Sequence, residues 1–145
     1  MASSAVHDRE DFIPALPHLR VTPEGAALFG TRCGSCNAMV EGERLACPSC
    51  GARDTLAFEP FAQTGTVHAH TVVHRSYPGV PTPFVSVIVD LDGGGTLRGT
   101  LREIDPLAPL PEPCRVELRF IDAGQTDPQG RPFLCYDFVP ERTAP

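Results

Sequence analysis

Four of the six cysteines fall into two Cys-x-x-Cys pairs, Cys33 with Cys36 and Cys47 with Cys50. Each pair has the spacing of a tight turn that aims both sulfurs at one centre, and the short segment between the pairs lets the two turns face each other. Four thiolates complete a tetrahedral metal site and leave no open position on the ion. The pattern therefore predicts one structural Zn²⁺ per chain, which holds the fold and does not activate water.

Two other uses of paired cysteines are less consistent with this sequence. Disulfides form in an oxidising compartment, but residues 1–10 contain no apolar signal-peptide core. A thioredoxin-like redox motif has one Cys-x-x-Cys between a strand and a helix, whereas this chain has two pairs. The metal site remains the favoured interpretation, and we expect a cytoplasmic protein.

The remaining reactive side chains do not form a catalytic set. His68, His70 and His74 are close in sequence, but no cysteine or carboxylate in that segment completes a metal site, so we expect exposed or hydrogen-bonded histidines. Cys114 and Cys135 lie among strand residues and are interpreted as buried thiols. We therefore predict no catalytic residues in this chain.

Charge and composition exclude several classes of protein. A net charge of -6 and a pI near 5.2 argue against a surface that binds a phosphate backbone. No apolar stretch is long enough to span a bilayer. With 16 prolines and 13 glycines, the chain is suited to short strands and many turns. We expect neither a nucleic-acid nor a membrane partner.

The chain is divided by pattern into three segments. Residues 1–27 are predicted to be a flexible lead, 28–56 a zinc ribbon, and 57–145 a small antiparallel OB-like β-barrel, so the fold class is mainly β. Alternation predicts strands within 65–77, 83–104 and 114–140, with a turn over 92–95 that glycine permits.

Alternation also assigns side chains to faces of the predicted strands. In the strand within 65–77 it places Val67, Ala69 and Thr71 on one face and His68, His70 and Val72 on the other. In the strand that follows Cys114 it points Val116, Leu118 and Phe120 inward.

The sequence resembles the DUF35 family, OB-fold proteins with a rubredoxin-like zinc ribbon that accompany acyl-CoA enzymes. The matching segments are "LFGTRCGSC", "CPSCGA" and "GTVHAHTVVHRSYPGVPTPFVSVIVDLDGGGTLRGTL", which continue in register from the ribbon into the barrel. The family usually has an aromatic-Pro-Pro-Arg segment between its cysteine pairs. Here residues 41–44 keep only the arginine, Arg44, and add Glu41 and Glu43.

The resemblance implies a noncatalytic subunit that docks on a thiolase or a thiolase-like aldolase, as a heterotetramer of two plus two. It would help to bind or channel the coenzyme A thioester in acyl-CoA metabolism, such as the degradation of aromatic or sterol-type compounds. Because coenzyme A carries phosphates, the expected contacts are arginines, namely Arg75, Arg98, Arg44 and Arg102.

Two alternatives to the auxiliary subunit are a single-stranded nucleic-acid binding module and a stand-alone acyl-CoA thioesterase or hydratase. The nucleic-acid module is less consistent with the acidic charge, the absence of Trp and the presence of only two Tyr. The stand-alone enzyme lacks a visible pair of base and nucleophile.

Overall fold

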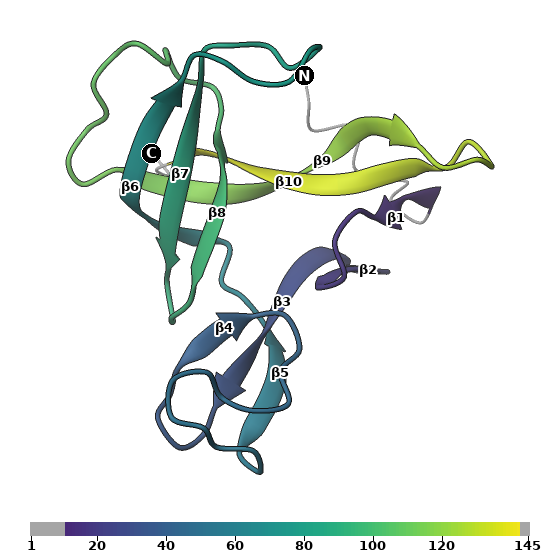
Figure 1. Ribbon diagram of the computed structural model, residues 1–145, viewed down its shortest axis with the longest axis vertical. Coiled ribbons are helices and arrows are strands. Elements are labelled where there is room, and N and C mark those ends of the chain that lie inside the picture. The colour runs from purple at the N-terminus through teal and green to yellow at the C-terminus, as the bar shows by residue number, and fades with distance from the viewer. Residues whose placement is uncertain (1–10, 143–145) are drawn as a thin grey trace.

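The computed structural model describes residues 11–142 and forms ten strands there, without an α-helix. The strands are β1 (Ile13–Pro14), β2 (Leu19–Thr22), β3 (Gly25–Cys33), β4 (Met39–Glu41), β5 (Leu56–Pro60), β6 (Thr64–Val73), β7 (Phe84–Leu91), β8 (Thr96–Leu101), β9 (Arg115–Thr126) and β10 (Pro132–Pro140). Strands β3, β4 and β5 form the lower part of Figure 1, and β6 to β10 form the upper part. The predicted mainly β class is confirmed.

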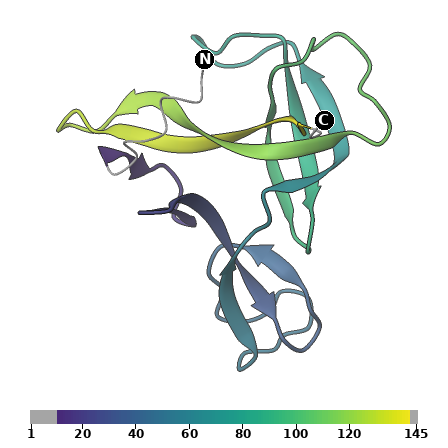
Figure 2. The same ribbon diagram turned by 180° about the vertical axis from the view of Figure 1, so that it is seen from behind.

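Five strands close into a barrel in the order β10, β8, β7, β6, β9, because β9 also pairs with β10. The contact that joins β10 to β8 is short, with one register pair between Phe138 and Leu101. Strands β9 and β10 continue past the barrel as a two-stranded arm, and β1 pairs in parallel with β10 there (Figures 1 and 2). The predicted OB-like barrel is therefore present.

The barrel strands form where apolar residues alternate with polar ones. In β9 the buried side chains are Val116, Leu118 and Phe120, as alternation predicts. In β7 every second residue from Val85 to Leu91 is buried in the same way. These residues surround Phe138 of β10, whose side chain is fully buried.

One predicted strand face is wrong because β6 contains a bulge. Its register against β7 shifts between Val67 and Ala69, so one residue of β6 is left out of the alternation. Beyond the bulge, His70 pairs with Val87, on the face to which Val67 also belongs. Val67 and Ala69 therefore lie on opposite faces rather than together.

Strands β2 to β5 form a second sheet built around β3. Strand β2 pairs with one half of β3, and β4 and β5 pair with its other half. Leu19 of β2 is fully buried. The predicted lead, residues 1–27, thus contains β1, β2 and the start of β3, and its first ten residues lie outside the described part. The boundaries drawn at 27/28 and 56/57 stay predictions.

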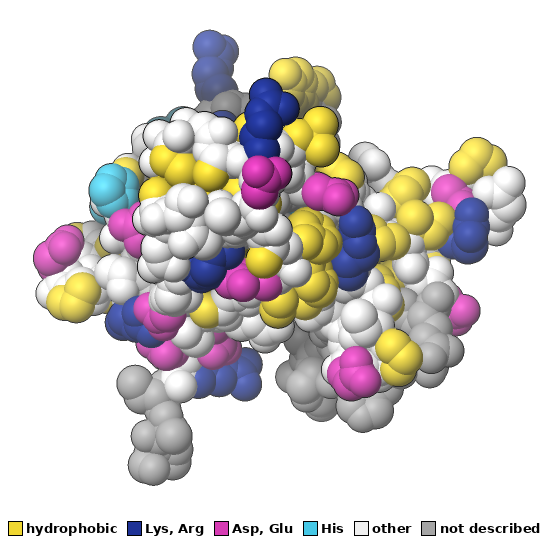
Figure 3. Space-filling model, turned by 90° about the horizontal axis from the view of Figure 1, so that it is seen from below, with side chains coloured by type: hydrophobic (Ala, Val, Ile, Leu, Met, Phe, Trp, Pro, Cys, Tyr) yellow, Lys and Arg dark blue, Asp and Glu magenta, His cyan; other side chains and the backbone are white. Residues whose placement is uncertain are grey.

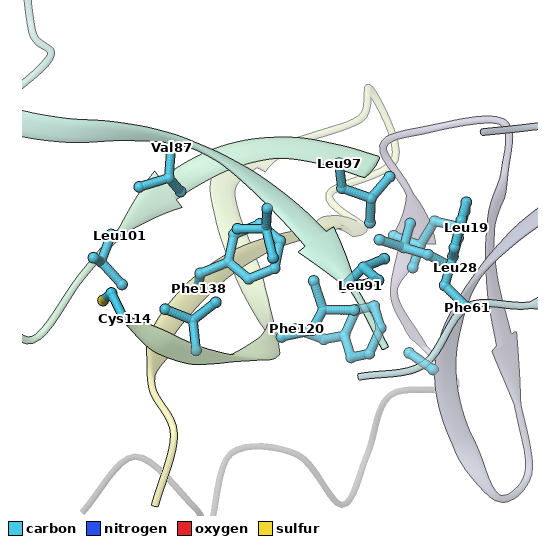
Figure 4. Close-up of a cluster of buried hydrophobic side chains, with 14 of the residues drawn as sticks. Leu19, Leu28, Phe61, Val87, Leu91, Leu97, Leu101, Cys114, Phe120 and Phe138 are labelled. Carbon is cyan, nitrogen blue, oxygen red and sulfur yellow. The ribbon is translucent and has the colours of Figure 1, made fainter. Parts of the chain in front are cut away.

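The ribbon sheet packs onto the barrel through one continuous core. Leu19, Leu28 and Phe61 on the ribbon side belong to the same buried cluster as Leu91 and Leu97 of the barrel (Figure 4). This shared core fixes the ribbon, and with it the cysteine pairs, against the barrel.

A polar contact joins the two parts at the turn between β7 and β8. The guanidinium of Arg32 donates through Nη2 to the carbonyl of Gly93 at 2.6 Å and through Nε to Glu59 at 2.5 Å. Nη1 of Arg32 lies 3.3 Å from the carbonyl of Asn37, in the first cysteine turn. One side chain therefore connects a cysteine turn, strand β5 and the barrel.

The part of the chain that the structure describes contains no helix with the length and apolarity that a membrane crossing requires.

Candidate functional site

The first cysteine turn begins where β3 ends. The N–H of Asn37 donates to the carbonyl of Cys33 at 2.8 Å, and the N–H of Cys33 donates to Ala38 at 2.8 Å. Asn37 has a φ of 65°, in the left-handed region that asparagine tolerates. The chain thus reverses immediately after Cys36 and leaves both sulfurs on one side.

The second cysteine turn repeats the first one bond for bond. The N–H of Gly51 donates to Cys47 at 2.8 Å, and the N–H of Cys47 donates to Ala52 at 2.8 Å. Gly51 has a φ of 82° and occupies the place of Asn37 in the first turn. Two equivalent turns facing each other are what a four-thiolate metal site requires.

The four sulfurs form one cluster. All four Sγ atoms lie within 4.8 Å of one another. The pairs Cys33–Cys50 and Cys36–Cys47 are each 3.6 Å apart. A tetrahedral ion with metal–sulfur bonds of about 2.3 Å holds its sulfurs about 3.8 Å apart, so the cluster has the size of a zinc site. The four cysteines can hold a metal ion.

The electrostatics of the cluster favour thiolates on some members and disfavour them on others. The backbone N–H of Cys36 is the main cause that lowers the pKa of Cys33 to about 6, against the effect of burial. At Cys50 the N–H of Ala52 lowers the pKa, but the neighbouring cysteines, Cys33 first, and burial together raise it to about 12. Four thiolates this close repel one another, so full ionisation requires a cation at the centre.

The arginines expected to contact coenzyme A are not gathered at one place. Arg98 lies on β8, Arg102 directly after it, and Arg75 in the segment that follows β6. Arg44 lies instead on the ribbon, between the cysteine pairs, where it lines a cleft that none of the other three enters. None of the four forms an ion pair within residues 11–142.

His68 and His70 lie on β6 of the barrel, His74 directly follows that strand, and the two remaining cysteines belong to the same part of the chain. His68 Nδ1 is 2.9 Å from Oδ2 of Asp90 on an exposed surface. Cys114 is buried, and burial raises the pKa of its thiol. Cys135 is partly buried. Among the described residues, the four ribbon cysteines are the group whose ligand atoms are close enough to share a metal ion.

The cleft that Arg44 lines was not predicted. It has a volume of about 490 Å³ and is bounded by residues 17, 18 and 20, residues 41–44 and Phe58. Three separate segments meet there because β2, β4 and β5 all pair with β3. The sequence does not predict this arrangement of strands, because residues 14–22 have too little alternation to indicate a strand in the ribbon sheet.

Comparison with known proteins finds a family match for the barrel and a structural likeness over most of the chain. Residues 58–120 match the family model of the ChsH2 C-terminal OB-fold domain. A solved structure described as the Ltp2–ChsH2(DUF35) aldolase contains a chain with 28% identity and a TM-score of 0.60, in a match that covers 79% of this chain and 84% of that chain. No curated protein matches. The OB-fold part of this chain therefore matches the ChsH2 C-terminal domain, and the chain as a whole is similar to a DUF35 protein.

Proposed function

We propose that this chain is a noncatalytic auxiliary subunit of a thiolase-fold enzyme, a thiolase or a thiolase-like aldolase. The observation that carries the proposal is the likeness to the DUF35 chain of an aldolase. A coverage of 79% is more than residues 57–145 alone supply, so the match extends from the barrel into the N-terminal part. The two chains therefore share more than a common barrel.

We propose that the metal is zinc, one ion per chain, bound by Cys33, Cys36, Cys47 and Cys50. The size of the sulfur cluster and the two equivalent turns support this assignment. Four sulfur ligands leave no place for water or substrate, so the ion has a structural role. It fixes the ribbon, which in turn packs on the barrel through the shared core.

The finer parts of the proposal concern the substrate. If the partner uses a coenzyme A thioester, Arg75 and Arg98 are the barrel side chains that we propose for its phosphates, because both are exposed and neither forms an ion pair within the described chain. Arg44 lies among carboxylates and is considered below. The two-plus-two assembly and the cytoplasmic location remain predictions.

The test is recovery of the tagged chain from its native host, with metal content and mass of the complex determined on one sample. We expect a thiolase-fold chain and about one zinc per copy. A metal-loaded chain recovered alone, or with nucleic acid, would overturn the proposed function.

A matched pair of variants isolates the role of the metal. Cys47→Ser removes one ligand of the cluster, whereas Cys135→Ser removes a thiol that lies outside it. We expect the first variant to lose both metal and partner and the second to keep both. Equal loss in the two variants would contradict a metal-dependent interface.

A further inference from the structure

The cleft beside Arg44 lies at a break along one edge of β3. The N–H of Phe29 donates to the carbonyl of His18 at 2.8 Å, and the carbonyl of Phe29 accepts the N–H of Gly42 at 3.2 Å. Since both groups of Phe29 point to the same edge, β2 and β4 follow each other along it. The cleft lies between β2 and β4, at the point along this edge where β3 changes its strand partner.

Two arginines at this break have N–H groups that are not all used within the chain. Arg20 donates to the carbonyls of Pro17 and Leu19. Arg44 donates through Nε to the carbonyl of Glu41 at 3.1 Å. Neither guanidinium forms an ion pair within residues 11–142. Each has N–H groups left for an acceptor in the cleft.

Stacked rings hold one of these arginines in place. The guanidinium carbon of Arg20 lies 5.7 Å from the centre of the Phe58 ring. That ring is itself stacked on Phe29, with the ring centres 5.0 Å apart and an angle of 19° between the planes. The cation–π contact orients the guanidinium before any ligand arrives, which lowers the entropy lost on binding.

A buried histidine lies in the wall of the cleft. His18 is 8% exposed, and its Nε2 lies 2.8 Å from Oε1 of Glu41. This contact joins the segment before β2 to β4, and the nitrogen atom itself is closed to solvent. The donors that a ligand in the cleft can reach are therefore those of the two arginines.

The charged side chains that line the cleft favour some anions over others. Glu41 and Glu43 offset Arg20 and Arg44, so the lining carries little net positive charge. A polyphosphate depends on a strong positive field, which this site lacks. A single carboxylate depends more on directed hydrogen bonds from guanidinium groups, and such bonds are available here. The chemistry therefore favours a carboxylate over a phosphate.

The surface around the cleft favours a polypeptide as the carrier of that carboxylate. Phe58 is 40% exposed, and Leu45, next to Arg44 in sequence, is 88% exposed. The end of the molecule that carries the ribbon shows hydrophobic side chains beside basic and acidic ones (Figure 3). Apolar side chains exposed around a polar centre are typical of a protein interface.

We propose that this cleft binds an acidic side chain on an extended segment of a partner protein. Arg20 and Arg44 donate to the carboxylate, and Phe58 and Leu45 contact the apolar residues that flank it. The identity of the partner as the thiolase-fold subunit rests on the proposed function, whereas the binding chemistry does not.

The experiment uses the metal-loaded full chain and three probes, followed by NMR titration. The first probe is a short peptide, acetylated and amidated at its ends, with one glutamate between apolar residues. The second is its glutamine counterpart, and the third is benzoate. We expect the glutamate peptide to shift the ring signals of His18 and Phe58 and the Nε–H signals of both arginines, with affinity at least about tenfold above the glutamine peptide.

Variants of exposed arginines test the site without disturbing the fold. Arg20→Gln and Arg44→Gln should each weaken the glutamate peptide by about tenfold, because each removes a charge-assisted hydrogen bond. Arg53→Gln is the control, since Arg53 is exposed on the same ribbon, outside the cleft. We expect no effect there.

Three results would overturn the proposal. They are the absence of shifts at the cleft, equal binding of the two peptides, and binding of benzoate without the peptide, which would indicate a site for small acids. Because the titration uses the isolated protein, its outcome is independent of partner recovery. The proposed function can fail while the peptide binds, and the peptide can fail while the partner is recovered.

Discussion

Replacement of Gly95 by alanine tests how the ribbon is fixed to the barrel. Gly95 ends the turn between β7 and β8 with a φ of 91°. A Cβ added there would lie 2.4 Å from Cε1 of Phe61 and 3.2 Å from Cγ of Met39. Phe61 and Met39 belong to the ribbon side of the shared core. The substitution therefore forces apart the two surfaces that position the cysteine cluster.

The expected magnitude has two parts. A left-handed backbone costs alanine about 1–2 kcal/mol relative to glycine, and overpacking of a filled core costs about 1–3 kcal/mol more. Gly93 is the matched control in the same turn, because its φ is 82° and a Cβ there meets nothing within 4 Å. We expect Gly93→Ala to show only the backbone cost, about 1–2 kcal/mol, and Gly95→Ala to show about 2–5 kcal/mol.

The assay is urea unfolding of the metal-loaded protein, with the midpoints compared at unchanged slope. A second variant identifies the contact, since Phe61→Leu should recover part of the loss in the Gly95→Ala background while it destabilises the unmodified chain. Equal destabilisation by Gly93→Ala and Gly95→Ala would refute the packing argument. The cost of alanine at Gly95 would then come from the backbone conformation alone.

Three further perturbations have defined outcomes. Chelation of the metal should unfold the ribbon, seen as loss of dispersed amide signals from residues 28–56, and added zinc should restore them. Phe138→Ala should lower the unfolding free energy by about 3–5 kcal/mol, measured in urea, because the ring is fully buried. The Arg115 guanidinium, with the Thr64 hydroxyl, holds the pKa of the Asp92 carboxyl well below its ordinary range. The stability from this carboxylate is therefore present above about pH 4 and is lost as the pH falls below it. Asp92→Asn should lose that part of the acid dependence. Unfolding curves of the unmodified chain and the Asp92→Asn variant over roughly pH 2 to 7 measure this difference. Both proteins contain the same cysteines, so the effect of cysteine protonation cancels in the comparison.

The cysteine cluster could be predicted because its information is local. The spacing within each pair sets a turn, and the turn aims both sulfurs, with no dependence on distant residues. The barrel was predictable for a related reason, since alternation over β7 and β9 reports which side of a strand is buried. Both patterns extend over enough residues to determine a conformation.

Two features escaped prediction because they depend on neighbours in space. The bulge in β6 changes the face of every later residue in that strand, and nothing in the run from Val67 to Val73 marks it. The pairing of β2 with β3 was hidden in the same way, because four residues, Leu19–Thr22, are too few to show alternation. The unpredicted cleft is a direct result of that pairing.

Strand β3 also connects the cysteine cluster to the cleft. Strand β3 ends at Cys33, and the same strand supplies Phe29, whose backbone aligns β2 with β4 at the cleft. Arg44 lies on the segment between the two cysteine turns, so its position depends on both turns being closed. Loss of the metal should therefore remove peptide binding before it affects the buried barrel around Phe138. On the proposed binding mode, the four cysteines support recognition because they fix the loop that carries one of the two arginines.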